Sequence, residues 1–283
     1  RMNFFLLQLD YSLVLTSITT LLLGIFVYNA IRGEDLGKVF LLYCLSIAWW
    51  SFFQALHQTS SDKDISIAAA RLMTAGGSFL IPTLFVHFVV TLLEIRVKRR
   101  FLLFLYVLSL VFAGLSITPY MVVDAVPKFF LRSFLVPGPA YFLGVLFFLS
   151  CLVYGHYKLY KAYSTSSGLK RNQLTYLFWS SLFGYIGGAA NFLFVFDINI
   201  PFLSTFGTYA IPIYVAATTY AIVRYRLMDI RTVIHKTAMW VATSSLIILP
   251  FAGLFYFGHN WIESLNSQQE FLLLAVVIVL LIP

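Results

Sequence analysis

Charged residues are scarce in this chain of 283 residues: Asp, Glu, Lys and Arg make up 11% of it, whereas hydrophobic residues make up 60%. Soluble domains carry about 25% charged and about 45–50% apolar residues. The shortage of charge therefore excludes an ordinary soluble domain. It predicts an all-α fold, a polytopic transmembrane helix bundle.

Acidic residues are the rarer sign, with 11 Asp and Glu against 19 Lys and Arg, so the formal net charge is +8. The basic residues fall in short connections between apolar runs, where Lys and Arg set membrane topology instead of binding phosphates. We therefore expect the lipid bilayer, and not nucleic acid, as the partner of this positive charge.

Cysteine is nearly absent, since the only two, Cys44 and Cys151, both lie inside apolar runs. Two such thiols provide neither a disulfide framework nor a metal site, and we expect them to pack as small buried hydrophobic residues. The five histidines are also too dispersed for a metal site. We expect no metal in this chain.

Catalytic motifs are missing too: the sequence has no Walker A, GxGxxG, GxSxG or HExxH pattern, and no histidine followed by the spacing of a kinase phosphoacceptor box. We expect no catalytic residue and no cofactor in these residues. Spacing does not reveal side chains that meet from different helices.

Apolar segments dominate what is present. There are nine of them, at residues 11–31, 37–57, 66–94, 101–118, 140–163, 172–196, 202–223, 237–258 and 270–283. A helix needs roughly 20 residues to cross a hydrocarbon core of about 30 Å. All but the last segment reach about that length, so we expect about nine helices, seven plus two.

The connections between the segments alternate in charge: the odd ones hold fourteen Lys and Arg residues and the even ones three. Because cytoplasmic loops are enriched in Lys and Arg, we expect the N-terminus outside and the C-terminus in the cytoplasm. Residues 1–10 are then a short outer segment, with Arg1 a remnant of cloning before Met2. Residues 11–230 form a seven-helix domain, and 231–283 add two transmembrane helices that lead to a cytoplasmic output domain missing from this chain.

The fourth connection, residues 119–139, is too apolar for a solvated loop, with Phe129 and Phe134 ahead of Pro137 and Pro139. It predicts a hairpin or lid that folds back on the outer mouth of the bundle. A segment that rests on the lipid headgroups explains the same composition equally well.

Arg71 lies about 9 Å inside the third segment at 1.5 Å per residue, and Asn191 lies at comparable depth in the sixth. A charge at the centre of a bilayer costs at least about 2.5–3.5 kcal/mol, so Arg71 needs a partner. We expect it either to line a polar pocket in the outer half of the bundle or to act as a structural clamp at the interface. The clamp partners would be Asp62, Asp64 or Asp197. The other candidate ligand-binding residues are Gln54, His57, Tyr209, Tyr141 and His87.

Two further features concern packing. Pro82 predicts a kink, or free carbonyls in the preceding turn, and His87 beyond it is expected to be a neutral packing residue more often than a ligand. Gly184 and Gly188 have the small-xxx-small spacing that lets helix backbones approach closely.

With the segments placed, residues 11–230 resemble the N-terminal seven-helix (7TM) sensor region of bacterial membrane histidine kinases. The most specific match is the run Tyr220-Ala-Ile-Val-Arg-Tyr-Arg-Leu-Met-Asp-Ile230. Within it, Arg224, Arg226 and Asp229 mark the junction, as an interfacial anchor by their charge and as a family signature by resemblance. Shorter matches occur in the expected order, at residues 70–72, 79–88, 136–139, 170–177, 187–192 and 200–201.

The resemblance implies a membrane sensor in a two-component signal transduction system of the bacterial inner membrane. In such proteins the bundle passes its signal to a homodimeric cytoplasmic kinase, which uses ATP and Mg²⁺ and starts a phosphorelay to a response regulator. The nine-helix topology is also similar to that of the acyl-homoserine-lactone receptor kinases. No kinase core is present here, so a diguanylate cyclase or phosphatase output is equally compatible, and a transporter-like bundle or an intramembrane enzyme are the alternatives from other classes.

The leading hypothesis is therefore a sensor that binds a small or amphipathic signal in the outer half of the bundle. The signal would lie among the second, third, sixth and seventh helices, below residues 119–139. Arg71 would hold an anionic or carbonyl group, Asn191 would supply paired hydrogen bonds, and aromatic walls would hold the apolar part.

Overall fold

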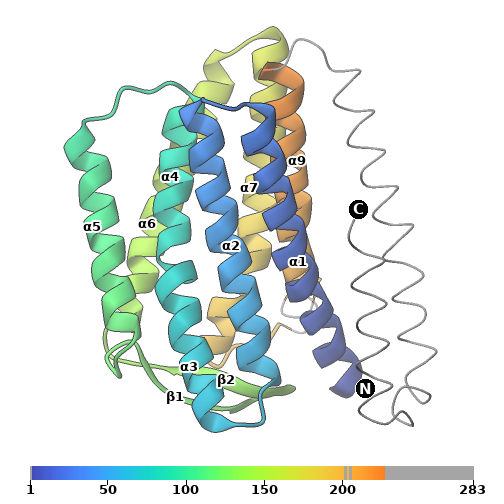
Figure 1. Cartoon of the computed structure of the whole chain (residues 1–283), viewed down its shortest axis with the longest axis vertical. Helices are drawn as coiled ribbons and strands as arrows, with labels where there is room; N and C mark the ends of the chain where they lie inside the picture. Colours follow the sequence, from blue (N-terminus) through green and yellow to red (C-terminus); the bar gives the residue numbers. More distant parts are fainter. Residues whose placement is uncertain (1, 201–202, 204–205, 227–283) are drawn as a thin grey trace, which may run out of the picture. The chain divides into compact units, whose positions relative to one another are not determined.

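The computed structural model describes residues 2–200, 203 and 206–226 of the chain. Figure 1 shows an all-helical bundle with one small β-hairpin, which confirms the fold class expected from the composition. The elements are α1 (Met2–Ala30), α2 (Asp35–Thr59), α3 (Lys63–Met73), η1 (Thr74–Ser78), α4 (Leu80–Leu92), α5 (Arg99–Ser116), β1 (Val122–Lys128), β2 (Leu131–Pro137), α6 (Tyr141–Thr165), α7 (Gly168–Val195), η2 (Gly207–Tyr209) and α9 (Ala210–Arg226).

Six helical segments within the described residues are long and apolar enough to cross a membrane, and α9 is a shorter apolar helix. They correspond to the first seven expected segments. The helices expected at 237–258 and 270–283 and the junction residue Asp229 lie outside the described residues. The count of nine and the orientation in the membrane therefore stay predictions.

The short connections have local causes. Between α1 and α2 the chain turns through Gly33 at φ 91°, a backbone conformation that residues with a Cβ rarely adopt. Between α2 and α3, the Asp62 carboxylate accepts hydrogen bonds from the backbone N–H groups of Asp64 and Ile65, at 2.9 and 3.0 Å. Asp62 is thus a helix N-cap, which explains why a new helix starts so soon after Thr59.

The third crossing is interrupted where the sequence predicted a disturbance before Pro82. A π-helical turn, η1, separates α3 from α4. Side chains of α2 bond the carbonyl groups there: Ser46 donates to the Gly76 oxygen at 2.9 Å, and Trp49 Nε1 donates to the Leu72 oxygen at 2.8 Å. A Cβ on Gly77 would lie 2.5 Å from the Cβ of Trp50, so glycine is needed for this close approach.

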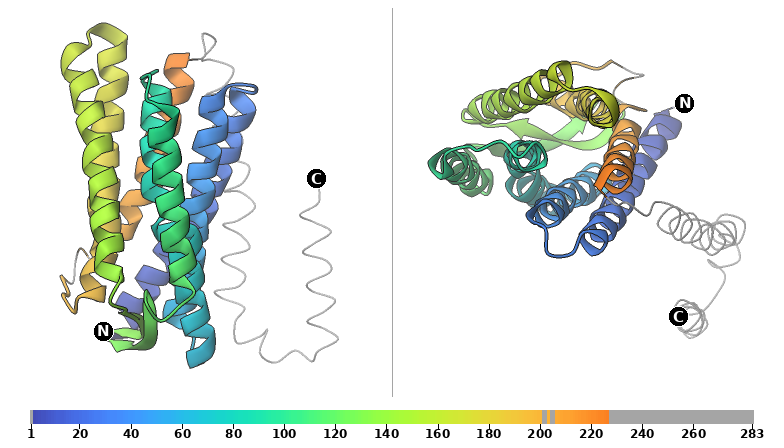
Figure 2. Two further views of the ribbon diagram at one scale, coloured as in Figure 1. Left: turned by 90° about the vertical axis from the view of Figure 1, so that its left-hand side faces the viewer. Right: turned by 90° about the horizontal axis from the view of Figure 1, so that it is seen from above.

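The helices form a ring. α1 packs against α2 and α9, α2 against α3 and α4, α4 against α6, α6 against α7, and α7 against α9. α5 packs on α4 and η1 and stands at the edge of the bundle, as the view from above in Figure 2 shows. Its large side chains Leu103, Phe104 and Leu110 are about 60% exposed, which suits a helix that faces lipid.

Residues 122–137 form an antiparallel hairpin at one end of the ring, with Ala125 opposite Leu135 and Val126 opposite Phe134. The chain turns at Phe129, which has φ 54°. The hairpin is buried against the bundle through Val122, Leu131, Phe134 and Leu135. The apolar composition of this connection therefore serves packing on protein.

The two ends of the bundle differ in charge. The hairpin lies at the same end as the start of α1 and the α2–α3 connection (Figure 1). The opposite end holds the connections α1–α2, α4–α5 and α6–α7 and the last turn of α9, where Arg224 and Arg226 lie. Most of the Lys and Arg residues counted in the odd connections are therefore at this second end, which we call the basic end.

Candidate functional site

A cavity lies inside the ring, next to the hairpin. Its volume is about 70 Å³, counted as the space that the centre of a water molecule can occupy. This is enough for several waters or part of a small ligand. Five helical segments and β2 contribute to its wall. The wall residues of α2 are Tyr43, Ile47, Trp50 and Gln54, and those of α7 are Gly184, Tyr185, Gly188, Asn191, Phe192 and Val195.

The rest of the wall comes from three helical segments and the hairpin. The third crossing contributes Met73, Ser78 and Ile81, α6 contributes Tyr141 and Phe148, and α9 contributes Ile211 and Tyr214. The hairpin closes the cavity at its own end of the bundle with Phe134 and Leu135 of β2. The hairpin is thus a part of the cavity wall.

Three tyrosines form the inner part of the wall. The hydroxyl groups of Tyr43 in α2 and Tyr185 in α7 are 2.8 Å apart, and both side chains are buried. The Tyr214 ring of α9 packs 6.4 Å from the Tyr43 ring and 6.1 Å from the Tyr185 ring, centre to centre. This cluster joins the three helices α2, α7 and α9.

Two carboxamides supply polar groups to the same wall. Asn191 Nδ2 donates to the Gly188 carbonyl of its own helix at 3.1 Å, and this bond leaves Asn191 Oδ1 buried without a hydrogen-bond partner. Gln54 is 1% exposed, and its Nε2 atom also has no partner. The Tyr214 hydroxyl on the same wall is a third buried atom without a partner. Buried polar groups of native proteins are usually bonded, so three such atoms on one cavity need a reason.

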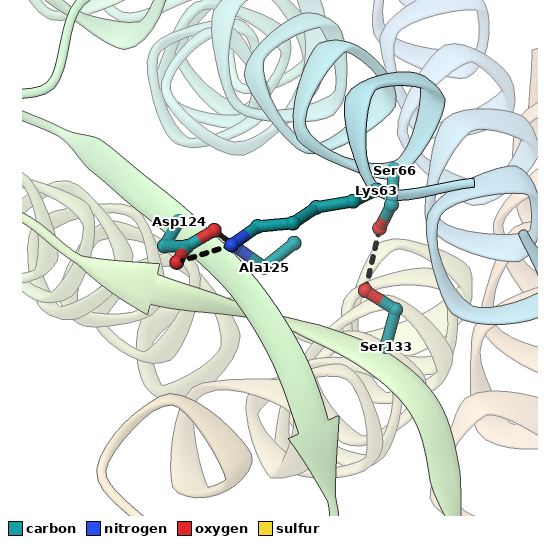
Figure 3. A network of polar contacts seen from close by, with 5 residues as sticks. All are labelled: Lys63, Ser66, Asp124, Ala125 and Ser133. Atoms are coloured by element: carbon teal, nitrogen blue, oxygen red, sulfur yellow. Dashed lines mark hydrogen bonds and ion pairs between the residues drawn. The ribbon is translucent and has the colours of Figure 1, made fainter. Parts of the chain in front are cut away.

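No charged side chain lines the cavity in the described part of the chain. The charges nearby bond to one another or to backbone. Lys63 of α3 donates to the Asp124 carboxylate of β1 at 2.8 Å, and the backbone N–H of Ala125 donates to the same carboxylate (Figure 3). The bond from Lys63 and, after it, the bond from Ala125 hold the pKa of Asp124 below its ordinary value.

A second tie to the hairpin lies beside this ion pair. Ser66 of α3 and Ser133 of β2 have their Oγ atoms 2.6 Å apart, as Figure 3 shows. Ser66 Oγ is also 2.8 Å from His57 Nδ1 and donates to the His57 carbonyl. The distance between His57 and Ser66 is that of a catalytic base and its nucleophile. Both side chains are fully buried, however, and Ser66 Oγ already has three hydrogen-bond partners. Its arrangement is that of a structural bond.

Arg71 also bonds to the hairpin. Its guanidinium donates to the backbone carbonyl of Val122 in β1 at 3.3 Å. Arg71 is absent from the cavity wall, and within the described residues it forms no ion pair with Asp62, Asp64 or Asp197. Asp197 pairs instead with Lys128 at 2.8 Å. Arg71 thus holds the hairpin by a main-chain oxygen.

The expected site residues therefore divide into two groups. Gln54, Asn191 and Tyr141 lie on the cavity wall. Arg71 and His57 lie in the bonds that hold the hairpin, Tyr209 lies in η2, and His87 Nδ1 is 2.8 Å from the Tyr106 hydroxyl of α5. Among the described residues no group of three His, Cys, Asp or Glu side chains is placed to hold a metal.

Sequence reasoning missed the tyrosines Tyr43, Tyr185 and Tyr214 and the tryptophan Trp50. One signal was available: each carries a polar atom in the middle of an apolar segment, and such atoms usually find a partner when buried. Many other Tyr and Trp residues of this chain share that property. These four line the cavity because the rotation of each helix about its axis turns them toward it.

Comparison with known proteins gives one family. A family model described as the N-terminal 7TM region of histidine kinase matches residues 12–231, which is well over half of the chain. No curated protein and no solved structure matches the chain. The matched residues run from α1 past the end of α9 and so contain the whole hairpin and the whole cavity wall.

Proposed function

We propose a function from the premise that the chain belongs to the family of N-terminal 7TM regions of histidine kinases. The chain is a multi-pass membrane protein region, and we propose that it receives the input signal of a histidine kinase. The signal is a small molecule that binds in the cavity below the hairpin.

The cavity is the observation that carries this proposal. Its wall combines residues of α2, α7 and α9 with the hairpin, so a bound molecule contacts all four at once. A ligand shifts a conformational equilibrium only by the difference of its affinities for the two states. A cavity shared by several helices is where such a difference arises.

The route to the output runs along α9. This helix packs closely on α7, because Gly184 of α7 faces Tyr214 and Gly187 faces the Gly207 backbone. α9 then ends at the basic end, at Arg226. A ligand that changes the α7–α9 contact changes the position of the segment that leaves the bundle.

The finer parts of the proposal follow from the family. The membrane is the bacterial cytoplasmic membrane, and the kinase acts as a homodimer. The kinase uses ATP and Mg²⁺ in its cytoplasmic domains, and the phosphoryl group passes to a response regulator. Residues 231–283 connect the bundle to those domains.

The test is a chimera in which the 283 residues are joined to the cytoplasmic part of a histidine kinase and reconstituted in lipid nanodiscs. The substitution Gly188→Leu fills the cavity, since an added Cβ at Gly188 has its nearest neighbour at 3.4 Å, in Ile211. The matched control is Gly114→Leu in α5, where an added Cβ meets nothing within 4 Å. Autophosphorylation from labelled ATP is measured for each.

We expect Gly188→Leu to change the basal rate of autophosphorylation severalfold and Gly114→Leu to leave it unchanged. Equal rates for the two variants, with both folded by circular dichroism, would contradict a sensor role for the cavity. Transport of a solute by proteoliposomes that contain the chain would favour a transporter instead.

A further inference from the structure

We infer that the ligand of this cavity is uncharged and carries both a hydrogen-bond donor for Asn191 and a hydrogen-bond acceptor for Gln54. This inference rests on the proposed function, because it names the class of molecule that the same cavity binds. The sequence alone predicted an anionic or carbonyl group held by Arg71.

The first step is the absence of charge. All the residues on the cavity wall within the described part of the chain are uncharged, including the polar ones. An ionised ligand buried there would lose its hydration without gaining a counter-charge, which is very costly in a surrounding of low polarity. Three cations beside the hairpin bond to other partners: Arg71 to Val122, Lys63 to Asp124, and Lys128 to the carbonyls of Phe194 and Val195.

The second step is the direction of the Asn191 amide. Its Nδ2 atom is committed to the Gly188 carbonyl, and that bond fixes which end of the amide is nitrogen. Its Oδ1 atom is buried, has no partner and can only accept. A ligand that satisfies it has to present an N–H or O–H group.

The third step is Gln54, on the opposite side of the ring from α7. Gln54 Nε2 is buried without a partner and donates. Satisfying it requires an oxygen or another acceptor on the ligand. A primary amide is a small neutral group that offers both an N–H donor and a carbonyl acceptor.

The fourth step is the apolar remainder. Ile47, Phe148, Phe192 and Ile211 surround the rest of the space. The hydroxyls of Tyr43 and Tyr185 bond to each other. The Tyr214 hydroxyl has no partner, and it can donate to or accept from the same polar end of a ligand. The ligand class is therefore a short apolar chain or ring with a neutral amide-like end.

Four probes of equal chain length test this class: hexanamide, heptan-2-one, hexanoate and hexylammonium. Heptan-2-one has the shape of hexanamide with a methyl group in place of the NH₂, so it keeps the acceptor and loses the donor. The 283-residue chain in nanodiscs is dialysed against each radiolabelled probe, and nanodiscs without protein correct for partition into lipid.

We expect saturable binding of hexanamide, binding of heptan-2-one that is about tenfold weaker or more, and no saturable binding of the two ions. Asn191→Leu should reduce the difference between hexanamide and heptan-2-one, because it removes the Oδ1 acceptor that the NH₂ group of hexanamide uses. Gln54→Met should weaken both neutral probes. Gly188→Leu, which leaves the polar atoms in place, should abolish binding of every probe.

Three results would overturn the inference: hexanoate or hexylammonium bound as tightly as hexanamide, an unchanged difference between the neutral probes in folded Asn191→Leu, or no saturable binding of any probe. The chimera separates the two proposals. If Gly188→Leu still alters autophosphorylation, only the ligand class is wrong, and if it does not, the proposed function is also wrong.

Discussion

At the hairpin end of the bundle, charged side chains bond to elements far away in the sequence, whereas at the basic end they bond to neighbours a few residues away. Lys63 pairs with Asp124, and Lys128 donates to the carbonyls of Phe194 and Val195 at 3.3 and 3.1 Å. These bonds join α3 to β1 and β1 to the end of α7.

The basic end shows local partners. Lys38 pairs with Asp35 three residues away, Lys158 lies over the Tyr154 ring at 5.2 Å, and Arg171 lies over the Tyr163 ring at 5.3 Å. Cations beside aromatic rings at the end of a bundle are typical of residues that anchor helices at a membrane interface. Charge thus fixes tertiary structure at the hairpin end and position in the membrane at the basic end.

The largest loss of stability is expected at Gly187, where the backbone of α7 contacts the backbone of Gly207. Gly187→Ala places a Cβ against the carbonyl of Gly207, and neither backbone is free to move away. We expect a loss of about 1–3 kcal/mol in the free energy of unfolding, as for overpacking in a core. Thermal unfolding in detergent measures it, with Gly114→Ala in the lipid-facing α5 as the control. Equal midpoints for the two variants would show that α7 and α9 are not in close contact.

The next effect concerns Lys128, whose side chain is 9% exposed while that of Asp197 is 75% exposed. Lys128→Met removes a charged donor from two carbonyls at the end of α7, of which Phe194 keeps the bond from the Asp197 N–H. We expect a cost of about 1.5–3 kcal/mol. Asp197→Asn removes only the exposed ion pair and should cost about 0–1 kcal/mol. Chemical unfolding of both variants gives the comparison, and a larger loss from Asp197→Asn would reverse our assignment.

A smaller effect is expected for the bond between Ser66 and Ser133. Ser133→Ala removes it and should destabilise the hairpin by about 0.5–1.5 kcal/mol. Ser150→Ala is the matched control, because Ser150 Oγ bonds only to the Leu146 carbonyl of its own exposed helix turn. Hydrogen exchange of the amides of residues 122–137 should become faster in the first variant only. Unchanged exchange would mean that other contacts hold the hairpin.

The smallest effect is a dependence on pH. The pKa of Asp124 is lower in the folded protein than its ordinary value of 3.8, so its contribution to stability is present above that value. It is lost as the pH falls below 3.8 through the folded pKa. Spin labels at Ile65→Cys and Val123→Cys should show a wider distance distribution near pH 3 than at pH 6. The widening should be smaller in Asp124→Asn, and an equal widening would assign it to another group.

The helices and the position of the hairpin could be predicted because they depend on local properties. Runs of apolar residues give the helices, and the apolar residues of 119–139 indicated a segment that does not remain in water. The disturbance before Pro82 was predicted as well, since a proline lacks the N–H that its preceding turn requires. The disturbance takes the form of a π turn, and Ser46 and Trp49 of α2 donate hydrogen bonds to carbonyls in and beside it. This depends on the neighbouring helix, which the sequence does not place.

The cavity was only partly predictable. Gln54, Tyr141 and Asn191 were selected for their polarity and depth, and these properties do not depend on the partner helix. Arg71 was selected by the same reasoning but lies among the bonds of the hairpin. Depth along a helix follows from counting residues, whereas the direction of a side chain follows from the rotation of the helix. The π turn adds to this difficulty because it breaks the 3.6-residue period within the third crossing.

The sequence by itself determined that this chain is a helical membrane bundle, that its basic residues gather in alternate connections, and that it resembles the input region of a histidine kinase. These conclusions rest on composition, on the order of segments and on short motifs. Tertiary structure decided which polar groups meet: Arg71 at a hairpin carbonyl, and Gln54 and Asn191 on an uncharged cavity. Helix rotation and close contacts at glycine residues determine which polar groups come into contact. Both depend on residues far apart in the chain.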